Sequence, residues 1–221
     1  MVDDNVFREV DEELRRERLE KLWEKYGTII IGAIVLLILG VAGSIWWQNQ
    51  QVSKRQAAGD QYIQALRDVA KDDTDKADEK FKALIENSPK GYEIMSRLHL
   101  AANLASKGQT GEAEILYKKV TLNPSADKIL RDYAKLNLAI LKLENATYEE
   151  TSKALGEFTK PGAIWQNTAN EVVALAAFKE GKYDLAKTGF TDILTNKSTP
   201  SALKRRAQIM IDVIATRQVQ K

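Results

Sequence analysis

Few residues in this 221-residue chain have the types and spacing that catalysis requires. The single histidine, His99, lies in the apolar-rich stretch 93–105, where a histidine more often packs among its neighbours than acts as a base or a ligand. A Ser/His/Asp site would depend on this imidazole, and no nucleophile motif lies near it. The chain also has no cysteine and no glycine-rich phosphate-binding loop. We therefore predict that the protein is not an enzyme and uses no cofactor.

A cluster of carboxylates is the one pattern that suggests a metal ion. Asp72, Asp73, Asp75 and Asp78 resemble the start of a calcium-binding loop, but the glycine and the closing glutamate of an EF-hand are missing. Such a run also fits a solvated loop that leads into the N-terminus of a helix. We favour the loop and expect no metal site.

The distribution of charge excludes one class of partner. The formal net charge is +2, but residues 1–25 carry nine acidic and six basic side chains, so this part has a net charge of −3 and the remainder +5. Neither part is basic enough to predict binding to nucleic acid. The absence of cysteine leaves the redox compartment undetermined.

The strongest structural signal is the apolar stretch Thr28–Trp47. These 20 residues lie within a longer run that has no charged side chain, and as a helix they extend about 30 Å, the hydrocarbon thickness of a bilayer. A buried helix of a soluble domain would usually be shorter and would have a polar face. A cleaved signal peptide would have a shorter apolar region and would not end in two tryptophans. We predict an uncleaved transmembrane signal anchor.

The basic residues around this stretch predict its orientation. Six lysines and arginines precede it, whereas three follow it between positions 48 and 67. Because the flank richer in Lys and Arg usually stays in the cytoplasm, the tail, 1–27, is expected to be cytoplasmic and the domain, 48–221, to be exported. In a bacterium this arrangement is a single-pass inner-membrane protein with a periplasmic domain. Four aromatic residues fit the two membrane interfaces as anchors: Trp23, Tyr26, Trp46 and Trp47.

Two surfaces of this N-terminal region each have two interpretations. Gly32 and Gly40 fall near one face of the span, which would suit self-association through a helix–helix contact, although small residues are common in membrane helices. The tail is helix-prone and has a short apolar stripe of Phe7, Val10 and Leu14. This tail is either a solvated helix that leads into the membrane or a docking surface.

After the span, the chain has a helical pattern with an internal repeat. In each copy a small residue is followed four positions later by a larger apolar one. The small residue lets two helices approach closely, and the larger one, on the same helix face, fills the seam between them. The pairs are Ala77/Phe81, Ala113/Tyr117, the degenerate Thr151/Leu155 and Ala186/Phe190, at spacings of 36, 38 and 35 residues.

These spacings are close to the 34-residue period of tetratricopeptide repeats. We predict an all-α fold with one N-terminal transmembrane helix and a tetratricopeptide-like repeat domain; a plain helical bundle is the alternative, which the fourfold spacing disfavours. Thr147 and Glu150 are expected to form a capping box. Thr199, as N-cap, and Pro200 are expected to begin a last helix that caps the array.

The whole layout resembles a known family. The charged stretch 11–27, the single anchor, the lead segment 48–62 and the repeats resemble the YfgM family, the ancillary subunits of the bacterial Sec translocon. The resemblance covers nearly the whole chain. It implies an inner-membrane protein beside the translocon, whose periplasmic repeats link exported clients to periplasmic chaperones, and it implies an association with envelope-stress regulation.

The repeat pattern also places a candidate binding surface. In such repeats the first helix of each pair lines the concave face, and alignment on the turn glycines Gly108 and Gly181 assigns residues to it. Ala102 and Leu175 occupy the slots where a clamp for acidic chaperone tails would have asparagine, which disfavours that ligand class. An apolar groove would take a helix or an extended segment, or would be filled by the chain's own last helix. The predicted partner-binding residues are Met95, Leu98, Ala102, Thr168, Glu171, Leu175 and Lys179.

Two classes of function follow from the sequence. The first is a translocon-associated adaptor that passes exported clients to chaperones. The second is a scaffold subunit of an envelope or cell-division complex, assembled through the membrane helix and the tail. A third class, an organelle import receptor with cytosolic repeats, would require the opposite orientation.

Overall fold

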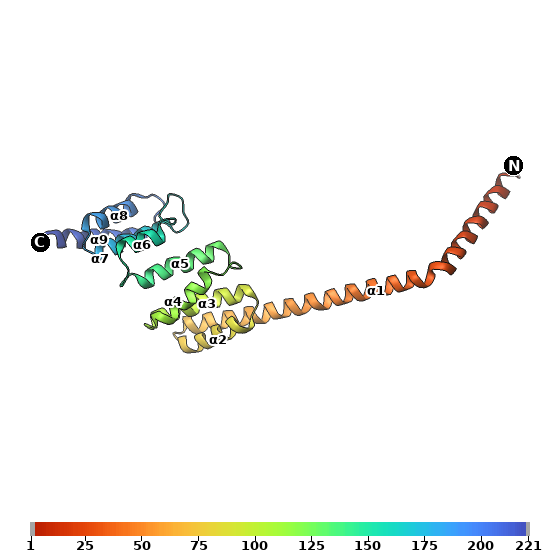
Figure 1. Cartoon of the computed structure of the whole chain (residues 1–221), viewed down its shortest axis with the longest axis horizontal. Helices are drawn as coiled ribbons and strands as arrows, with labels where there is room; N and C mark the ends of the chain where they lie inside the picture. The colour runs from red at the N-terminus through yellow and green to blue at the C-terminus, as the bar shows by residue number, and fades with distance from the viewer. Residues whose placement is uncertain (1–2, 220–221) are drawn as a thin grey trace. The chain divides into compact units, whose positions relative to one another are not determined.

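The computed structural model describes residues 3–219, which contain helices and no strand. The predicted all-α fold class is therefore confirmed. The helices (Figure 1) are α1 (Asp3–Ala70), α2 (Thr74–Asn87), α3 (Lys90–Ser106), α4 (Thr110–Thr121), α5 (Lys128–Lys142), α6 (Tyr148–Leu155), α7 (Gln166–Lys179), α8 (Tyr183–Thr195) and α9 (Ser201–Val219).

The chain forms two compact units, Met1–Gln56 and Ala57–Lys221. Helix α1 contributes to both, because its last residues, 57–70, belong to the second unit. The apolar stripe predicted from Phe7 in the tail lies outside the residues whose side chains the structure describes.

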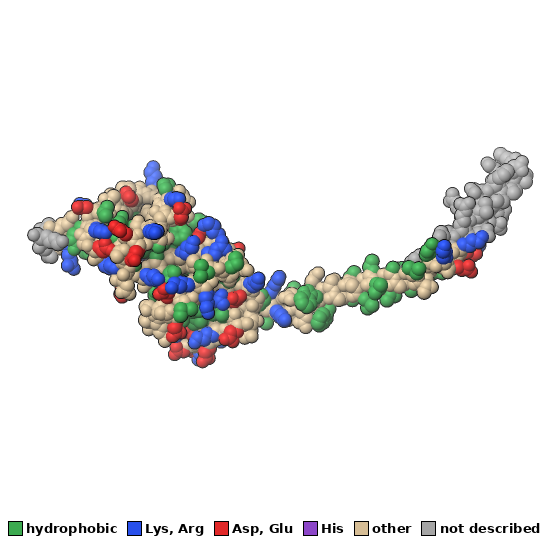
Figure 2. Space-filling model, viewed as in Figure 1, with side chains coloured by type: hydrophobic (Ala, Val, Ile, Leu, Met, Phe, Trp, Pro, Cys, Tyr) green, Lys and Arg blue, Asp and Glu red, His purple; other side chains and the backbone are tan. Residues whose placement is uncertain are grey.

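In the first unit, the predicted span is helical and its apolar side chains are exposed. Ile29 and Leu36 are 67% and 71% exposed, and an 18-residue window of this helix has a mean hydropathy of 2.7, with none of it buried in the protein. Figure 2 shows the stretch in green and tan, without the blue or red of charged side chains. The core helix of a soluble domain would be covered by protein. By length and composition, this helix can cross a membrane.

The second unit is a series of helical hairpins (Figure 1). Helices α3 and α4, α5 and α6, and α7 and α8 form successive pairs, and α9 packs on α7 and α8. The first hairpin consists of α2 and the end of α1, where the rings of Tyr62 and Phe81 lie 6.1 Å apart. Residues 57–70 are therefore the first helix of the first repeat. From the sequence alone, residues 48–62 are recognisable only as a segment that leads into the repeats.

The repeat residues pack as the sequence predicts. All four small residues and all four of their larger partners are at most 3% exposed. In the degenerate hairpin α5/α6, Thr151 takes the place of alanine, and its hydroxyl donates to the carbonyl of Thr147 at 2.9 Å. This bond satisfies the one polar group that the degenerate repeat places in the seam.

Three hairpin turns share one backbone conformation. Gly108 and Gly181 have φ values of +77° and +73°, as expected of glycine at a helix end, and Asp72 adopts the same region at +62°. In each turn the next residue donates its N–H to the carbonyl five positions earlier, as Gln109 does to Leu104 at 2.9 Å. The acidic run that begins at Asp72 is thus a turn leading into α2, as predicted.

The predicted helix starts are partly correct. The capping box is confirmed, since the Thr147 N–H donates to Glu150 Oε2 at 2.8 Å and the Glu150 N–H donates to Thr147 Oγ1 at 3.2 Å. The cap predicted for α9 is wrong. The Thr199 hydroxyl donates to Asn167 Oδ1 on α7 at 3.0 Å, and α9 begins one residue after Pro200. Thr199 is nearly buried, so a neighbouring helix offers its hydroxyl a partner that the sequence does not reveal.

The core is divided into three clusters along the array. The first joins the end of α1 with α2, α3, α4 and one side of α5, the second and smallest joins α5, α6 and α7, and the third joins α7, α8 and α9. Each hairpin therefore packs mainly on its neighbours, as expected of a repeat protein.

Lysines near the ends of α3, α5 and α7 reach back to the preceding hairpin. Lys107 Nζ lies 2.6 Å from the carboxylate of Asp78, and Lys142 Nζ lies 2.8 Å from that of Glu114. Lys179 Nζ donates to three carbonyl oxygens in the turn between α5 and α6, at 2.6 to 3.0 Å. Asp78 is almost fully buried, so its pairing avoids an isolated charge in the core. These contacts tie each hairpin to the one before it.

Candidate protein-interaction surface

One side of the repeat domain is formed by the first helices of the hairpins. On α3, Met95, Leu98 and Ala102 follow i, i+3, i+7 spacing, and on α5, Ile129 and Ile140 are eleven residues apart, so each set lies on one helix face. Two pockets open along these faces. We call the surface made by residues 57–70, α3, α5, α7 and α9 the first-helix face.

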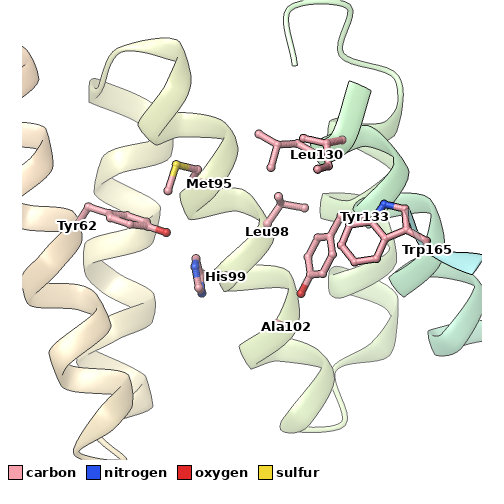
Figure 3. Close-up of a pocket in the computed structure, with 9 residues that line it drawn as sticks. Tyr62, Met95, Leu98, His99, Ala102, Leu130, Tyr133 and Trp165 are labelled. Atoms are coloured by element: carbon pink, nitrogen blue, oxygen red, sulfur yellow. The ribbon is translucent and has the colours of Figure 1, made fainter. Parts of the chain in front are cut away.

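The first pocket lies between the end of α1, α3 and α5 and has a volume of about 340 Å³ (Figure 3). Trp165, directly before α7, lies beside Tyr133, with ring centroids 5.6 Å apart. No acidic, lysine or arginine side chain lines this pocket, so it would accept an apolar or aromatic group. Its lining residues are Tyr62, Met95, Leu98, His99, Ala102, Ile129, Leu130, Tyr133 and Trp165.

His99 lines this pocket and packs on two aromatic rings. Its imidazole stacks on Phe81 at 5.3 Å with an interplanar angle of 11°, and lies edge-on to Tyr62 at 5.7 Å. Burial lowers the pKa of His99 and raises that of Tyr62. The packed, half-buried histidine that the sequence predicts is confirmed.

The second pocket lies between α5, α7 and α9 and has a volume of about 440 Å³. Arg206 Nε and Nη2 donate to the two oxygens of Glu171 at 2.7 and 2.8 Å, a two-pronged pairing that raises the pKa of the guanidinium. The Arg206 side chain is 60% exposed and that of Glu171 13%. The other lining residues are apolar except for Thr168: Ile140, Leu143, Val172, Leu175, Ile209 and Met210.

The residues predicted to anchor the span at the membrane interfaces are exposed. An added Cβ at Gly32 or Gly40 would meet no atom within 4 Å, so the glycine face of the span is also open. Interfacial anchoring and self-association stay predictions. The aromatic residues are Trp23, Tyr26, Trp46 and Trp47, between 42% and 64% exposed.

A family model described as a tetratricopeptide repeat-like domain matches residues 20–216. The chain belongs to this family. The match includes the apolar part of α1 as well as the hairpins, so the span and the repeats occur together in the family.

Curated relatives of this tetratricopeptide repeat-like protein share one name. A protein of Aggregatibacter actinomycetemcomitans, named ancillary SecYEG translocon subunit, is 24% identical over 188 residues, which cover 85% of this chain and 90% of the relative. A protein of Haemophilus influenzae with the same name is 24% identical over 148 residues, 67% of this chain and 72% of the relative. The resemblance to the ancillary translocon subunits is confirmed. No solved structure matches the chain.

The structure brings most of the predicted partner-binding residues of this tetratricopeptide repeat-like protein to the two pockets. The three on α3 line the first pocket, and three of the four on α7 line the second. Lys179 lies outside both, with its ammonium held by turn carbonyls. That any of them binds a partner stays a prediction. The pocket-lining six are Met95, Leu98, Ala102, Thr168, Glu171 and Leu175.

Sequence reasoning missed the residues that other elements contribute. Tyr62 comes from the helix treated as a lead segment, and Trp165 comes from the stretch before α7. The sequence predicts that α9 caps the array and leaves open that it fills the groove, but it does not indicate that Arg206, Ile209 and Met210 line the second pocket. No described residue of α9 lines the first pocket, so the chain's own last helix leaves that pocket open.

Proposed function

We propose that this protein is a membrane-anchored adaptor that binds protein partners on its first-helix face beside the bacterial Sec translocon. The observation that carries the proposal is a pair of open, largely apolar pockets on a repeat domain, together with a helix in the described part of the chain that is able to cross a membrane. Apolar pockets with few polar groups suit the side chains of a protein segment. The name of the two relatives supports the location at the translocon.

In this proposal the segments keep the roles that the sequence predicts. Residues 1–27 form a cytoplasmic tail, 28–47 cross the inner membrane, and 48–221 hold the repeats on the periplasmic side. The excess of Lys and Arg before the span supports this orientation. The exposed aromatic residues at both ends of the span support its position in the bilayer.

The partners in this proposal are the translocon, exported clients and periplasmic chaperones. The repeats bind without catalysing a reaction and pass clients from the translocon to chaperones. The aromatic packing of the one histidine supports a binding role, because its neighbours in the first pocket include no carboxylate to orient it as a base.

Photo-crosslinking in the native membrane tests the adaptor. A photoreactive residue at Ile129 or Ile209, both exposed on the first-helix face, is expected to capture a translocon subunit, a chaperone or an exported client. Ile115 on α4 is a matched control, because it is 55% exposed but belongs to a second helix of a hairpin. Recovery of cell-division or envelope-complex proteins without any translocon subunit would reject the adaptor in favour of the scaffold. Equal capture at Ile115 would reject the first-helix face.

Protease treatment of spheroplasts tests the orientation separately. The repeat domain is expected to be digested from outside, along with a periplasmic reference domain. Survival of the repeats, while the reference domain is cut, would place them in the cytoplasm and would reject both the orientation and the proposed partners.

A further inference from the structure

The two pockets differ in that only the second is lined by charged side chains, Arg206 of α9 and Glu171 of α7. Helix α9 carries four basic side chains and one acidic one. Of the basic residues, only Arg206 makes an ion pair among the described residues. The first pocket has no such residue. A segment lying along both pockets would therefore meet no charged side chain at one end, and at the other end the exposed guanidinium of Arg206 in its pair with Glu171.

Arg206 is held in position with part of its hydrogen-bonding capacity unused. A guanidinium group has five N–H donors, and Glu171 takes one from Nε and one from Nη2. Three donors remain on a side chain that is 60% exposed. Because Glu171 is mostly buried and fixes the planar group, little freedom remains to be lost when a second carboxylate binds.

Arg217 adds a second basic side chain along α9, beyond the residues that line the pocket. It is eleven residues after Arg206 and therefore on the same helix face, with Met210 and Val213 between them. Arg205, directly before Arg206 in the sequence, points about 100° away around the helix and does not line the pocket. Along this face of α9, two arginines thus flank two apolar side chains.

Helix α5 sets the distance between the two pockets. Tyr133 lines the first pocket and Leu143 lines the second. Ten residues of helix correspond to about 15 Å. A partner helix would place two apolar residues on one face at about this distance if they were eleven positions apart.

We propose that the first-helix face binds a segment of a protein partner that has two apolar anchor residues about 15 Å apart and carboxylates beside the second anchor, which pair with Arg206 and Arg217. This inference rests on the proposed function and specifies its ligand. The carboxylates lie over α9, which distinguishes this site from a clamp built at Ala102 and Leu175 on α3 and α7. Those two positions hold no polar group.

Labelled helical peptides test the inference with the full-length protein in nanodiscs of neutral lipid. Three peptides share leucines eleven positions apart and differ only in the turn beside the second leucine, which contains glutamate, glutamine or lysine. Fluorescence anisotropy at low salt is expected to rank affinity in that order, with about a tenfold advantage of glutamate over glutamine. Raising the salt concentration should remove most of this advantage.

Substitutions on α9 identify the arginine responsible. Arg206→Ala is expected to lower affinity for the glutamate peptide about five- to tenfold and to leave the glutamine peptide unchanged. Arg206→Lys should recover only part of the loss, because an ammonium cannot contact Glu171 and a second carboxylate with the same geometry. Arg205→Ala removes the same charge from the neighbouring position and should have little effect. A purely structural role of the Arg206–Glu171 pair would change binding of both peptides equally.

Several results would overturn the inference. If glutamate and glutamine peptides bind equally while crosslinks at Ile129 and Ile209 persist, the charge preference is wrong and the adaptor function stands. If no peptide binds and both crosslinks are absent, the proposed function fails too. Arg206-dependent binding to phosphatidylglycerol vesicles would show that the site contacts anionic lipid. Arg206-dependent dimerisation without peptide would show that a second copy occupies the surface.

Discussion

The two pockets of the first-helix face share helix α5 but differ in their relation to the core. Tyr62 and Leu98, which line the first, are each 6% exposed and belong to the largest core cluster. Ile140 and Ile209, which line the second, are 43% and 60% exposed. The first pocket is thus lined largely by core residues, whereas the second combines a core residue, Val172, with exposed residues of α5 and α9. These exposed residues of the second pocket can change with little effect on the fold.

The largest expected difference is in stability. Leu98→Ala should lower the free energy of unfolding by about 2–4 kcal/mol, because it leaves a cavity in the first core cluster. Ile209→Ala should change it by about 0.5 kcal/mol or less, since that side chain is mostly in solvent. Urea unfolding of the full-length protein in detergent, followed by circular dichroism, measures both. Similar losses for the two variants would contradict the distinction between the pockets.

Trp165→Ala is expected to lower stability and to affect partner binding at the first pocket but not at the second. The half-buried indole packs on Tyr133, so we expect a loss of about 1–2 kcal/mol, smaller than for a fully buried tryptophan. Crosslinking from Ile129 should fall, because the first pocket loses a wall, while crosslinking from Ile209 should be unchanged. A parallel fall at both positions would show that the pockets are not independent.

The first pocket should also respond to pH in a way that the second does not. Burial holds the pKa of His99 below its usual value, so the unfolded chain binds more protons than the folded one at mildly acidic pH. The free energy of unfolding should therefore fall as pH falls below about 6.5, by at most about 1.4 kcal/mol per pH unit. Urea unfolding at pH 7.5 and 5.5 measures the change, and His99→Gln should flatten it. An unchanged slope in that variant would assign the effect to other groups.

The smallest expected effect is at the rim of the second pocket. Glu171→Gln removes the charge that pairs with Arg206, and because the arginine is 60% exposed we expect a loss of stability of about 0.5 kcal/mol or less. The same urea unfolding measurement applies. A loss comparable to that of Leu98→Ala would mean that the pair holds α9 in place.

The sequence predicts those features that depend on local spacing. The small and large residues of each hairpin, the left-handed glycines and the Thr147–Glu150 capping box follow from patterns within a few residues. The candidate surface on α3 and α7 is predictable for the same reason, since the repeat register assigns one face of each first helix.

What the sequence does not predict depends on contacts between distant elements. The turn after the first helix of the array has no glycine to identify it in the sequence. Asp72 adopts there the left-handed conformation that Gly108 and Gly181 adopt in the later turns. Thr199 bonds to Asn167 across the α7–α9 contact instead of capping its own helix. The role of α9 in the second pocket likewise requires knowing which helix packs beside α7.

The lysine contacts at the ends of α3, α5 and α7 have a mechanical consequence. Each joins one hairpin to its predecessor, so in the proposed adaptor a pull between the membrane and a bound client would load these contacts one after another. The hairpins are expected to yield one at a time, beginning with the small core around α6. Such a repeat domain would lengthen stepwise under tension and could keep a bound client attached. A domain with a single cooperative core would instead unfold in one step.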